Sequence, residues 1–453
     1  MKTVLLIDDD KVLRHVLSTW LRAAGWSVHE AQDGEQGLEL AFAIKPQVIL
    51  VDLLMPRVNG FQVCRSIRSR KDILPKVRIV VTTGSGYTTD RLNALEAGAD
   101  DYLVKPINPE DLSRLLDGHL PPRNGVTDAA LVGDMGRSPS SAHTASQTLI
   151  RFWGVRGSIP TPGPSTVFYG GNTSCVEVRT MGEIIVLDAG TGIRPLGLAL
   201  EKEFGEKPIR CTVLISHTHW DHIQGFPFFV PAYNHRNIVR ILGFEGARQG
   251  LESTLSAQME SPYFPISMQQ MPGHIEINEL KNFHFEIGPV PVQAELVNHP
   301  GICTGYRISS AAGGICYLPD IELFQRLRSQ SNKDKEHLAF AQAQDEKLLH
   351  FIKDAAVLII DSQYDAEEYA HHVGWGHSCV EDAVDLALSA NVQHLFLFHH
   401  DPIHTDEEIS RLVAKARAIV LERGSKMVVE AAREGTELIL HPTEAEISET
   451  EVV

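Results

Sequence analysis

The sequence predicts two consecutive domains. Residues 1–120 are expected to form an α/β domain with a doubly wound, five-stranded parallel sheet, and residues 149–442 a larger domain that mixes strands and helices. Apolar runs alternate with helix-period stretches in the first part. A segment rich in small and polar residues then separates the two parts. A length of 453 residues is also too great for one ordinary domain.

Short apolar runs in the first 120 residues are typical of buried parallel strands. The clearest of these runs are Val4–Ile7, Val48–Val51, Ile79–Val81 and Tyr102–Val104. Helix-period stretches lie between them, among them Val12–Ala23 and Asp90–Glu96. Because strand and helix alternate, we expect a parallel sheet covered by helices.

Residues 121–148 contain small and polar residues with proline and glycine, so they cannot bury a core and predict a flexible linker. An extra strand or a short docked helix is the alternative. The acidic residues 443–453 predict a frayed tail. Between these segments we expect strands and helices at Leu149–Val155, Cys175–Arg179, Ile184–Leu187, Val213–Ser216, His337–Lys353, Val357–Ile360, Cys379–Ala390 and His394–Phe398.

Composition narrows the classes of function. The net charge of −17 argues against a broad nucleic-acid-binding surface, so no DNA partner is expected. The 6 cysteines are scattered without a close pair, which indicates no disulfide framework and favours a reducing cytoplasm. No apolar run approaches the length of a membrane span, and the N-terminus runs directly into a predicted strand, without a signal peptide. The 21 histidines are numerous and clustered, as in metal-binding proteins.

Polar residues follow the predicted strands of the first domain. Asp8, Asp9 and Asp10 follow the first strand, Asp52 the third, and Lys105 the fifth. Because the carboxyl ends of parallel strands meet at one edge, these side chains are expected to lie together. Carboxylates at that edge would bind Mg²⁺, and Asp52 could then act as a nucleophile toward a phosphoryl group.

These residues resemble the response-regulator receiver family over the full 120 residues, in the segments VLLIDDD, ILVDLLMPRVNG and GADDYLVKPI. The resemblance implies a sensor histidine kinase as partner and Asp52 as phosphoacceptor. It implies that Mg²⁺ is bound by Asp8, Asp9, Asp52 and the backbone carbonyl of Leu54. It also implies three residues that respond to the phosphoryl group, namely Thr83, Tyr102 and Lys105. The ungapped spacing to Lys105 favours Thr83 over Thr82, and Asp10 is expected only to cap a helix.

The segment ISHTHWDHIQG in the second domain carries four metal-ligand side chains within six residues, His217, His219, Asp221 and His222. A strand that leads into a tight turn can aim two of them at one ion and two at another. Histidine and carboxylate ligands suit Zn²⁺, with Mn or Fe as alternatives. Further ligand candidates each follow an apolar run, namely His299, Asp320 and His399.

HTHWDH is similar to the HxHxDH signature of the metallo-β-lactamase superfamily, and the similarity extends over nearly all of residues 150–442. It implies an α+β fold of the αββα sandwich type and a dinuclear metal centre. The first metal would be bound by His217, His219 and His299, and the second by Asp221, His222 and His399. Asp320 would bridge the two. Asp188 in LDAGTGIR is expected to support the histidine loop.

Two further motifs resemble the branch of this superfamily that holds small phosphodiesterases and tRNA 3′-processing ribonucleases. They are RFWGVRGSIPTPG with YGGNTSCVEV, and GWGHSCVEDAVDLA, in which His377 stands at a helix start. The resemblance implies that His377 binds phosphate or protonates the leaving oxygen, while Asp221 belongs to the catalytic centre. The alternative is that His377 only caps the helix. Arg156, Asn172 and Ser174 either line the site or have a purely structural role. His400 and His404 are expected to be exposed or to lie outside the shell of metal ligands.

The function expected from the sequence is a two-component response regulator with a dinuclear metal-dependent hydrolase as output domain. The preferred substrate is a small phosphodiester, such as a cyclic nucleotide or cyclic dinucleotide. The alternatives are a metal-dependent RNA endonuclease and a non-catalytic binding module controlled by phosphorylation. Phosphorylation of Asp52 is expected to shift a receiver surface that either blocks the mouth of the hydrolase or mediates formation of a homodimer.

Overall fold

The structure is a computed structural model that describes residues 2–53, 55, 57–70, 73–83, 94–95, 97–105, 107, 112, 115, 147–244, 250–261, 263–324 and 335–442. Four predictions concern residues outside this set: the linker up to residue 146, most of the helix Asp90–Glu96, the carbonyl of Leu54 and the tail at 443–453.

The N-terminal domain is a parallel sheet with strand order β2-β1-β3-β4-β5, which confirms the predicted fold class. Its elements are β1 (Thr3–Ile7), α1 (Lys11–Ala23), β2 (Ser27–Ala31), α2 (Gly34–Ile44), β3 (Val48–Asp52), α3 (Gly60–Ser69), β4 (Arg78–Thr83) and β5 (Asp101–Val104). The central strand β3 is buried along its whole length, as its apolar run predicts. Asp10 caps α1, because its carboxylate accepts hydrogen bonds from the backbone N–H groups of Val12 and Leu13.

The second domain contains two seven-stranded sheets. The first sheet, in the order β11-β10-β9-β8-β7-β6-β19, consists of β6 (Thr148–Gly154), β7 (Cys175–Thr180), β8 (Glu183–Leu187), β9 (Arg210–Leu214), β10 (Ile238–Gly243), β11 (His274–Glu279) and β19 (Glu437–Leu440). It is accompanied by α6 (Ile193–Phe204), α7 (Trp220–Ile223) and α8 (Leu251–Ala257). The strand expected at Val213–Ser216 ends at Leu214, and the chain turns there toward His217.

The second sheet runs in the order β12-β13-β14-β15-β16-β17-β18. Its strands are β12 (His284–Ile287), β13 (Val290–Val297), β14 (Cys303–Ser310), β15 (Gly313–Leu318), β16 (Val357–Asp361), β17 (His394–Phe398) and β18 (Val428–Ala431). Its helices are α10 (Lys335–Ile352), α11 (Ala366–Tyr369), α12 (Val380–Ser389) and α13 (Asp406–Glu422). Within the described residues, no helix is long and apolar enough to cross a membrane.

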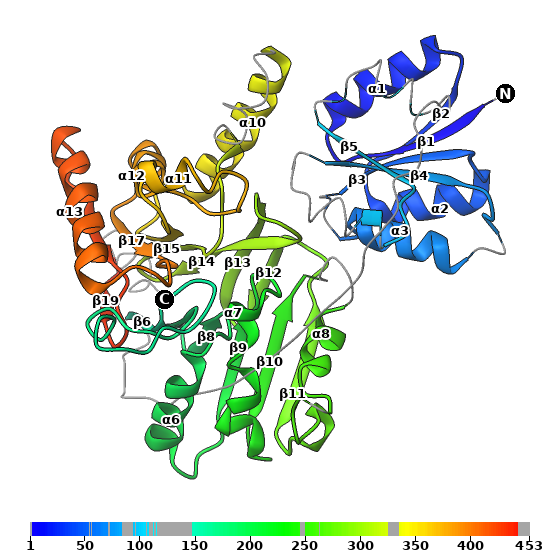
Figure 1. Cartoon of the computed structure of the whole chain (residues 1–453). Helices are drawn as coiled ribbons and strands as arrows, with labels where there is room; N and C mark the ends of the chain where they lie inside the picture. Colours follow the sequence, from blue (N-terminus) through cyan, green and yellow to red (C-terminus); the bar gives the residue numbers. More distant parts are fainter. Residues whose placement is uncertain are drawn as a thin grey trace, which may run out of the picture.

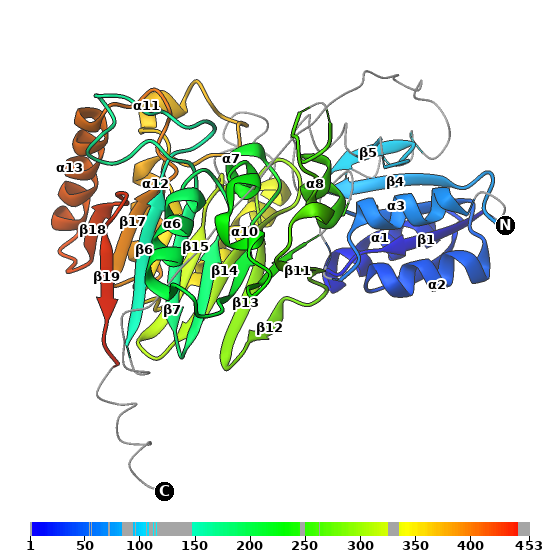
Figure 2. The ribbon, with the colours of Figure 1, turned by 90° about the horizontal axis from the view of Figure 1, so that it is seen from below.

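The two sheets face each other and the helices lie outside them, which confirms the sandwich expected of the second domain (Figures 1 and 2). One apolar cluster fills the space between the sheets and includes Phe152, Tyr306, Tyr317 and Phe398. Two others join each sheet to its own helices. Four layers with three apolar interfaces follow from strands that are buried on both faces.

The two domains touch. The core cluster of the N-terminal domain also contains Ile302 of the second domain, which is 6% exposed, and Phe244 and Leu296 pack against it. β1 runs from the N-terminus toward the second domain, so the carboxyl ends of the parallel strands face that domain (Figures 1 and 2).

All six cysteines are free thiols and all are buried. Burial raises the pKa of the thiols of Cys64 and Cys316 to about 12. The Sγ atom of Cys303 is 3.6 Å from Nδ1 of His217. The structure therefore contains no disulfide among its described residues, as the spacing of the cysteines predicts.

Arg156 is fully buried, and its guanidinium donates hydrogen bonds to the backbone carbonyls of Gly170, Asp401 and His404. These contacts tie the segment after β6 to the turn after β17, so the role of Arg156 is structural.

We expect Arg156→Met to destabilise the second domain by about 2–4 kcal/mol, because it leaves buried carbonyl groups without donors. The matched control is Arg210→Met, which removes an exposed arginine at the start of β9. Thermal unfolding followed by circular dichroism measures the effect. Equal melting temperatures for the two variants would contradict this role for Arg156.

Candidate functional site

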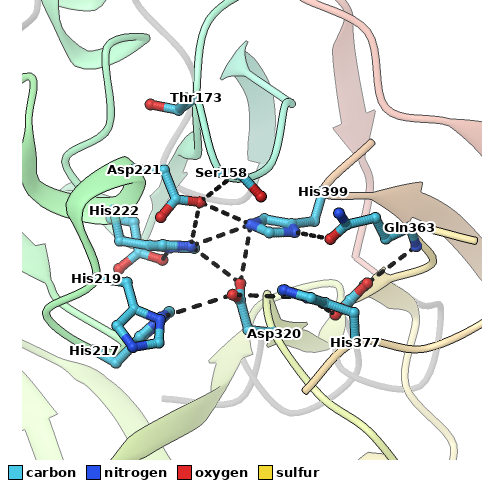
Figure 3. Close-up of polar contacts among 12 residues, drawn as sticks. Ser158, Thr173, His217, His219, Asp221, His222, Asp320, Gln363, His377 and His399 are labelled. Atoms are coloured by element: carbon cyan, nitrogen blue, oxygen red, sulfur yellow. Dashed lines mark hydrogen bonds and ion pairs between the residues drawn. The ribbon is translucent and has the colours of Figure 1, made fainter. Parts of the chain in front are cut away.

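Seven predicted ligand side chains meet at one rim of the sandwich, where strands of both sheets end (Figure 3). From the first sheet, the turn after β9 carries His217 and His219, and α7 carries Asp221 and His222. From the second sheet, the remaining three follow β13, β15 and β17, namely His299, Asp320 and His399. The shared rim follows from the rule that polar residues at the ends of apolar strands collect at one sheet edge.

The ligand atoms form two adjacent clusters. His217, His219, His299 and Asp320 place one ligand atom each within 4.8 Å of one another, and so do Asp221, His222 and His399. In the first cluster, Nε2 of His299 lies 3.0 Å from Nδ1 of His219. Two nitrogens bound tetrahedrally to one Zn²⁺ at about 2.05 Å would lie roughly 3.3 Å apart. The spacing therefore suits a shared ion.

The hydrogen bonds of the second cluster fix the tautomers of its histidines. Nδ1 of His222 donates to Asp188 at 2.8 Å, and Nδ1 of His399 donates to Oε1 of Gln363 at 3.2 Å. In the neutral rings both Nε2 atoms then carry lone pairs, and these atoms face each other at 3.3 Å. Oδ2 of Asp221 lies 3.2 Å from one of them and 3.0 Å from the other. Converging lone pairs and a carboxylate are unfavourable unless a cation lies between them.

Asp320 lies between the clusters and turns one oxygen to each. Oδ1 is 3.1 Å from Nε2 of His222 and 3.3 Å from Nε2 of His399. Oδ2 is 3.6 Å from Nε2 of His299 and 3.7 Å from Nε2 of His217. This geometry fits the bridging role expected of Asp320.

The absence of a proton on two of the histidines favours metal binding. Burial lowers the pKa of His217 and His299, so these two rings are neutral and keep a lone pair for a metal. Nε2 of His217 is buried without a hydrogen-bond partner among the described residues. Burial opposes the charged form of His222, but nearby carboxylates outweigh it and raise its pKa well above the usual range. The site thus attracts positive charge, either a proton or a metal ion.

The buried carboxylate of Asp188 accepts four hydrogen bonds beside the two clusters. It accepts from the backbone N–H and the hydroxyl of Ser216, each at 2.7 Å, and from His222 and the hydroxyl of Tyr317, each at 2.8 Å. Its φ of 59° lies in the left-handed region. Orienting contacts of this kind set the direction of a metal ligand.

His377 lies beside the centre, just before α12. Its Nδ1 is 2.8 Å from Oδ2 of Asp361 and 3.9 Å from Oδ2 of Asp320, and its ring stacks on that of His399 with centroids 5.0 Å apart. Burial opposes protonation of His377, but Asp361 outweighs burial and raises its pKa to about 9. His377 does not occupy the cap position of α12, because the backbone of Cys379 takes that position.

Three further residues contact the site but lie outside the set predicted from the sequence, namely Asp361, Gln363 and Ser158. Asp361 ends β16 at the same rim and orients His377, and Gln363 orients His399 while donating to Asp401 at 2.9 Å. The backbone N–H of Ser158 donates to Oδ2 of Asp221 at 2.8 Å. Only Asp361 had a usable signal, since it follows an apolar run as Asp320 does.

The remaining candidate residues, His400, His404, Asn172 and Ser174, make contacts that hold loops and strands together. His400 and His404 are buried, and their Nε2 atoms pair with the carbonyl of Ala432 and with Glu368. Burial lowers the pKa of His400 to about 3. Asn172 donates to Glu434. Ser174 is buried, and its backbone carbonyl accepts from Gly190.

In the N-terminal domain, the predicted edge residues also meet. Nζ of Lys105 lies 2.9 Å from Oδ2 of Asp8 and 2.9 Å from Oδ1 of Asp52, and Asp8, Asp9 and Asp52 could hold a metal ion. Burial raises the pKa of Asp52 to about 8, although Lys105 opposes this. Thr83 ends β4 fully buried and pairs with Val104 of β5, two residues after Tyr102. The hydroxyl of Thr82 donates instead to the carbonyl of Val51 at 3.4 Å.

Two family models match the chain. One is described as "Response regulator receiver domain" and matches residues 4–117, and the other as "Beta-lactamase superfamily domain" and matches residues 184–400. Among curated proteins, the chain is 41% identical over 109 residues to the "Probable transcriptional regulator ycf27" of Guillardia theta, covering 24% of this chain and 41% of that protein. The chain spans about half the length, between 41% and 55%, of the first curated relatives it matches.

Solved structures match each domain separately. The metallo-beta-lactamase fold protein YhfI from Bacillus subtilis is 14% identical, with a TM-score of 0.44, over 65% of this chain and 99% of that one. The Vibrio cholerae chemotaxis protein CheY4 is 32% identical, with a TM-score of 0.25, over 26% of this chain and 99% of that one.

We expect Asp188→Asn to weaken metal binding by about 10–100-fold, because the orienting partner of His222 is altered while the ligands remain. The matched control is Asp385→Asn on the exposed face of α12. Titration of zinc against a competing chelator measures the affinity. Wild-type affinity in Asp188→Asn would show that the hydrogen bond to His222 does not tune the centre.

Proposed function

Because the chain belongs to the response regulator receiver domain family over residues 4–117 and to the beta-lactamase superfamily over residues 184–400, we propose that it is a response regulator whose output domain is a dinuclear metal-dependent phosphodiesterase. The proposed domains are a receiver at 1–120, a linker at 121–148, a hydrolase domain at 149–442 and a tail at 443–453. The proposed substrate is a small phosphodiester, such as a cyclic nucleotide or cyclic dinucleotide.

The observation that carries this proposal is the pair of ligand clusters joined by Asp320. The first ion would be held by His217, His219 and His299, and the second by Asp221, His222 and His399, with Asp320 shared by both. The set of nitrogen and oxygen donors suits Zn²⁺, with Mn or Fe as alternatives. Two such ions would supply Lewis-acid stabilisation of the phosphoryl oxygens and activate a water molecule.

The side chains around the two ligand clusters would orient the ligands and transfer a proton. Asp188 and Gln363 orient the ligands His222 and His399. His377, held protonated by Asp361, is placed to deliver a proton to the leaving oxygen as the phosphorus–oxygen bond breaks.

Two tryptophans support a nucleotide substrate. Trp220 stands between the ligands His219 and Asp221, and Trp375 stands two residues before His377. Their exposed fractions are 51% and 62%. Exposed aromatic side chains beside a phosphodiester site favour stacking with nucleobases.

Control of the hydrolase is assigned to the receiver. The phosphohistidine of a sensor kinase would be the phosphoryl donor. An oxygen of Asp52 attacks its phosphorus, an O–P bond forms, the N–P bond breaks and the imidazole leaves. Mg²⁺ would be held by Asp8, Asp9, Asp52 and the carbonyl of Leu54. Thr83 and Lys105 would contact the phosphoryl oxygens, and Tyr102 would respond as the switch aromatic.

Metal-loaded protein is expected to hydrolyse bis-p-nitrophenyl phosphate and one member of a panel of cyclic mono- and dinucleotides. Asp221→Ala should lose the activity, because a ligand of the second ion is removed, whereas Asp385→Ala on the exposed face of α12 should keep it. Product analysis by chromatography identifies the substrate. Cleavage of an unprocessed tRNA alone would favour an RNA endonuclease, and failure on every phosphodiester would favour a non-catalytic binding module.

His377→Ala should lower kcat by about 10²–10⁴-fold on a substrate with a sugar-oxygen leaving group, because that oxygen needs a proton. On bis-p-nitrophenyl phosphate the loss should be far smaller, since p-nitrophenolate leaves without protonation. Metal content should be unchanged. Equal losses on both substrates would exclude His377 as the general acid.

A further inference from the structure

A short loop after β6 lies directly against the second ligand cluster. A Cβ atom at Gly157 would come within 2.5 Å of the ring of His399, so only glycine lets the backbone approach this closely. The N–H of Gly157 donates to the carbonyl of His400 at 3.0 Å. The N–H of Ser158 donates to Oδ2 of Asp221 at 2.8 Å. The loop is therefore fixed over two side chains of that cluster (Figure 3).

Ser158 itself has an unfavourable backbone conformation. Its φ of 60° lies in the left-handed region, which residues other than glycine rarely adopt. The N–H of Ile159 donates to the carbonyl of Gly157 at 2.6 Å, so Ser158 is the central residue of a γ-turn. A γ-turn whose central residue has a positive φ is rare and strained. Strain of this kind is concentrated at active sites and other functional positions.

The packing of the fold does not account for a serine at this position. The side chain of Ser158 is exposed, so it fills no space in the core. A glycine would adopt the same backbone conformation without the steric conflict of a Cβ atom. Glycine already stands at position 157, where the approach to His399 requires it. A strained, exposed serine beside a metal ligand therefore points to a chemical use of its hydroxyl group.

The hydroxyl of Ser158 lies within reach of a group bound at the second ligand cluster. Two carbon atoms separate its oxygen from the N–H that donates to Asp221, and Oδ2 of Asp221 is 3.0 Å from Nε2 of His399. Figure 3 shows Ser158 beside both side chains. A carboxylate and a neutral ring nitrogen offer lone pairs, whereas a hydroxyl can donate a hydrogen bond. Ser158 thus adds a donor next to a cluster of acceptors.

We propose that the hydroxyl of Ser158 donates a hydrogen bond to a non-bridging oxygen of the phosphodiester at the second ligand cluster. This inference rests on the proposed phosphodiesterase function and adds a substrate-contacting residue to it. The γ-turn holds the hydroxyl at the site before the substrate arrives, so little ordering of the loop accompanies binding. The strain at Ser158 is then the consequence of holding a neutral donor at a fixed place beside the ions.

Two variants of the full-length, metal-loaded protein separate the hydroxyl from the strain. Ser158→Ala removes the hydroxyl and keeps the Cβ atom, whereas Ser158→Gly removes both. Each should weaken the binding of inorganic phosphate, measured by isothermal titration calorimetry, by about 10-fold, because a hydrogen bond to a charged group is lost. Each should lower kcat/KM for bis-p-nitrophenyl phosphate by a similar factor. Metal content should stay unchanged, since the N–H that donates to Asp221 remains in both variants.

The melting temperature distinguishes the two variants. Ser158→Gly should raise it by roughly 2–4 °C, because glycine relieves the left-handed strain, and Ser158→Ala should not. Met181→Gly is the matched control for relief of strain, since Met181 has a φ of 51° in the turn between β7 and β8. The other end of β8 leads to Asp188, so this turn lies far from the ligands. Met181→Gly should keep wild-type phosphate binding and kcat/KM.

Wild-type phosphate binding in Ser158→Ala would overturn the proposal, and so would a metal-loaded wild-type protein that binds no phosphate. Full hydrolysis of phosphodiesters by Ser158→Ala would refute this contact alone and leave the proposed function intact. Phosphate binding does not depend on turnover. A protein that binds phosphate through Ser158 but hydrolyses no phosphodiester would therefore refute the proposed function and still support the contact.

Discussion

A buried carboxylate, that of Asp188, connects the fold to its chemistry. It follows β8 of one sheet and accepts hydrogen bonds from Ser216, which lies in the turn after β9, from the hydroxyl of Tyr317 in the facing sheet and from the candidate ligand His222. Such a group is costly to bury unless its oxygens are satisfied. The arrangement that satisfies Asp188 also fixes the distance between the sheets at the rim and the direction of one histidine. The position of the candidate metal ligands is therefore linked to the way in which the two sheets pack.

The two sites differ in what compensates the negative charge of their carboxylates. In the receiver, the ammonium of Lys105 lies between Asp8 and Asp52 and compensates their charges permanently. At the sandwich rim, no lysine or arginine forms an ion pair with Asp221 or Asp320 among the described residues, and histidine nitrogens face them instead. A site with a resident cation can accept an additional anion such as a phosphoryl group. A site without one has to acquire its cation from solution.

Much of this could be predicted from the sequence, because one rule covers both domains: polar residues that follow apolar strands collect at a sheet edge. That rule and the histidine spacing located Asp52, Lys105, Asp320 and the histidine ligands. The rule applies equally to Asp361, which ends the apolar run of β16. The partnerships of Gln363 with His399 and of Glu322 with Gly376 depend on loop conformation and side-chain rotamers, which no periodicity encodes. The contact of Ile302 with the receiver was equally hidden, since a single apolar residue in a turn carries no pattern.

The burial of the cysteines lowers the reactivity of their thiols toward oxidants. A thiol with a pKa of about 12 is almost entirely protonated at neutral pH, and oxidants react with the thiolate. Cys303, beside the ligand His217, is buried in the same way, and burial raises the pKa of its thiol well above the usual range. A soft sulfur atom next to a metal centre would otherwise be a point of oxidative damage. Burial therefore keeps these thiols in the protonated form, with which oxidants react slowly.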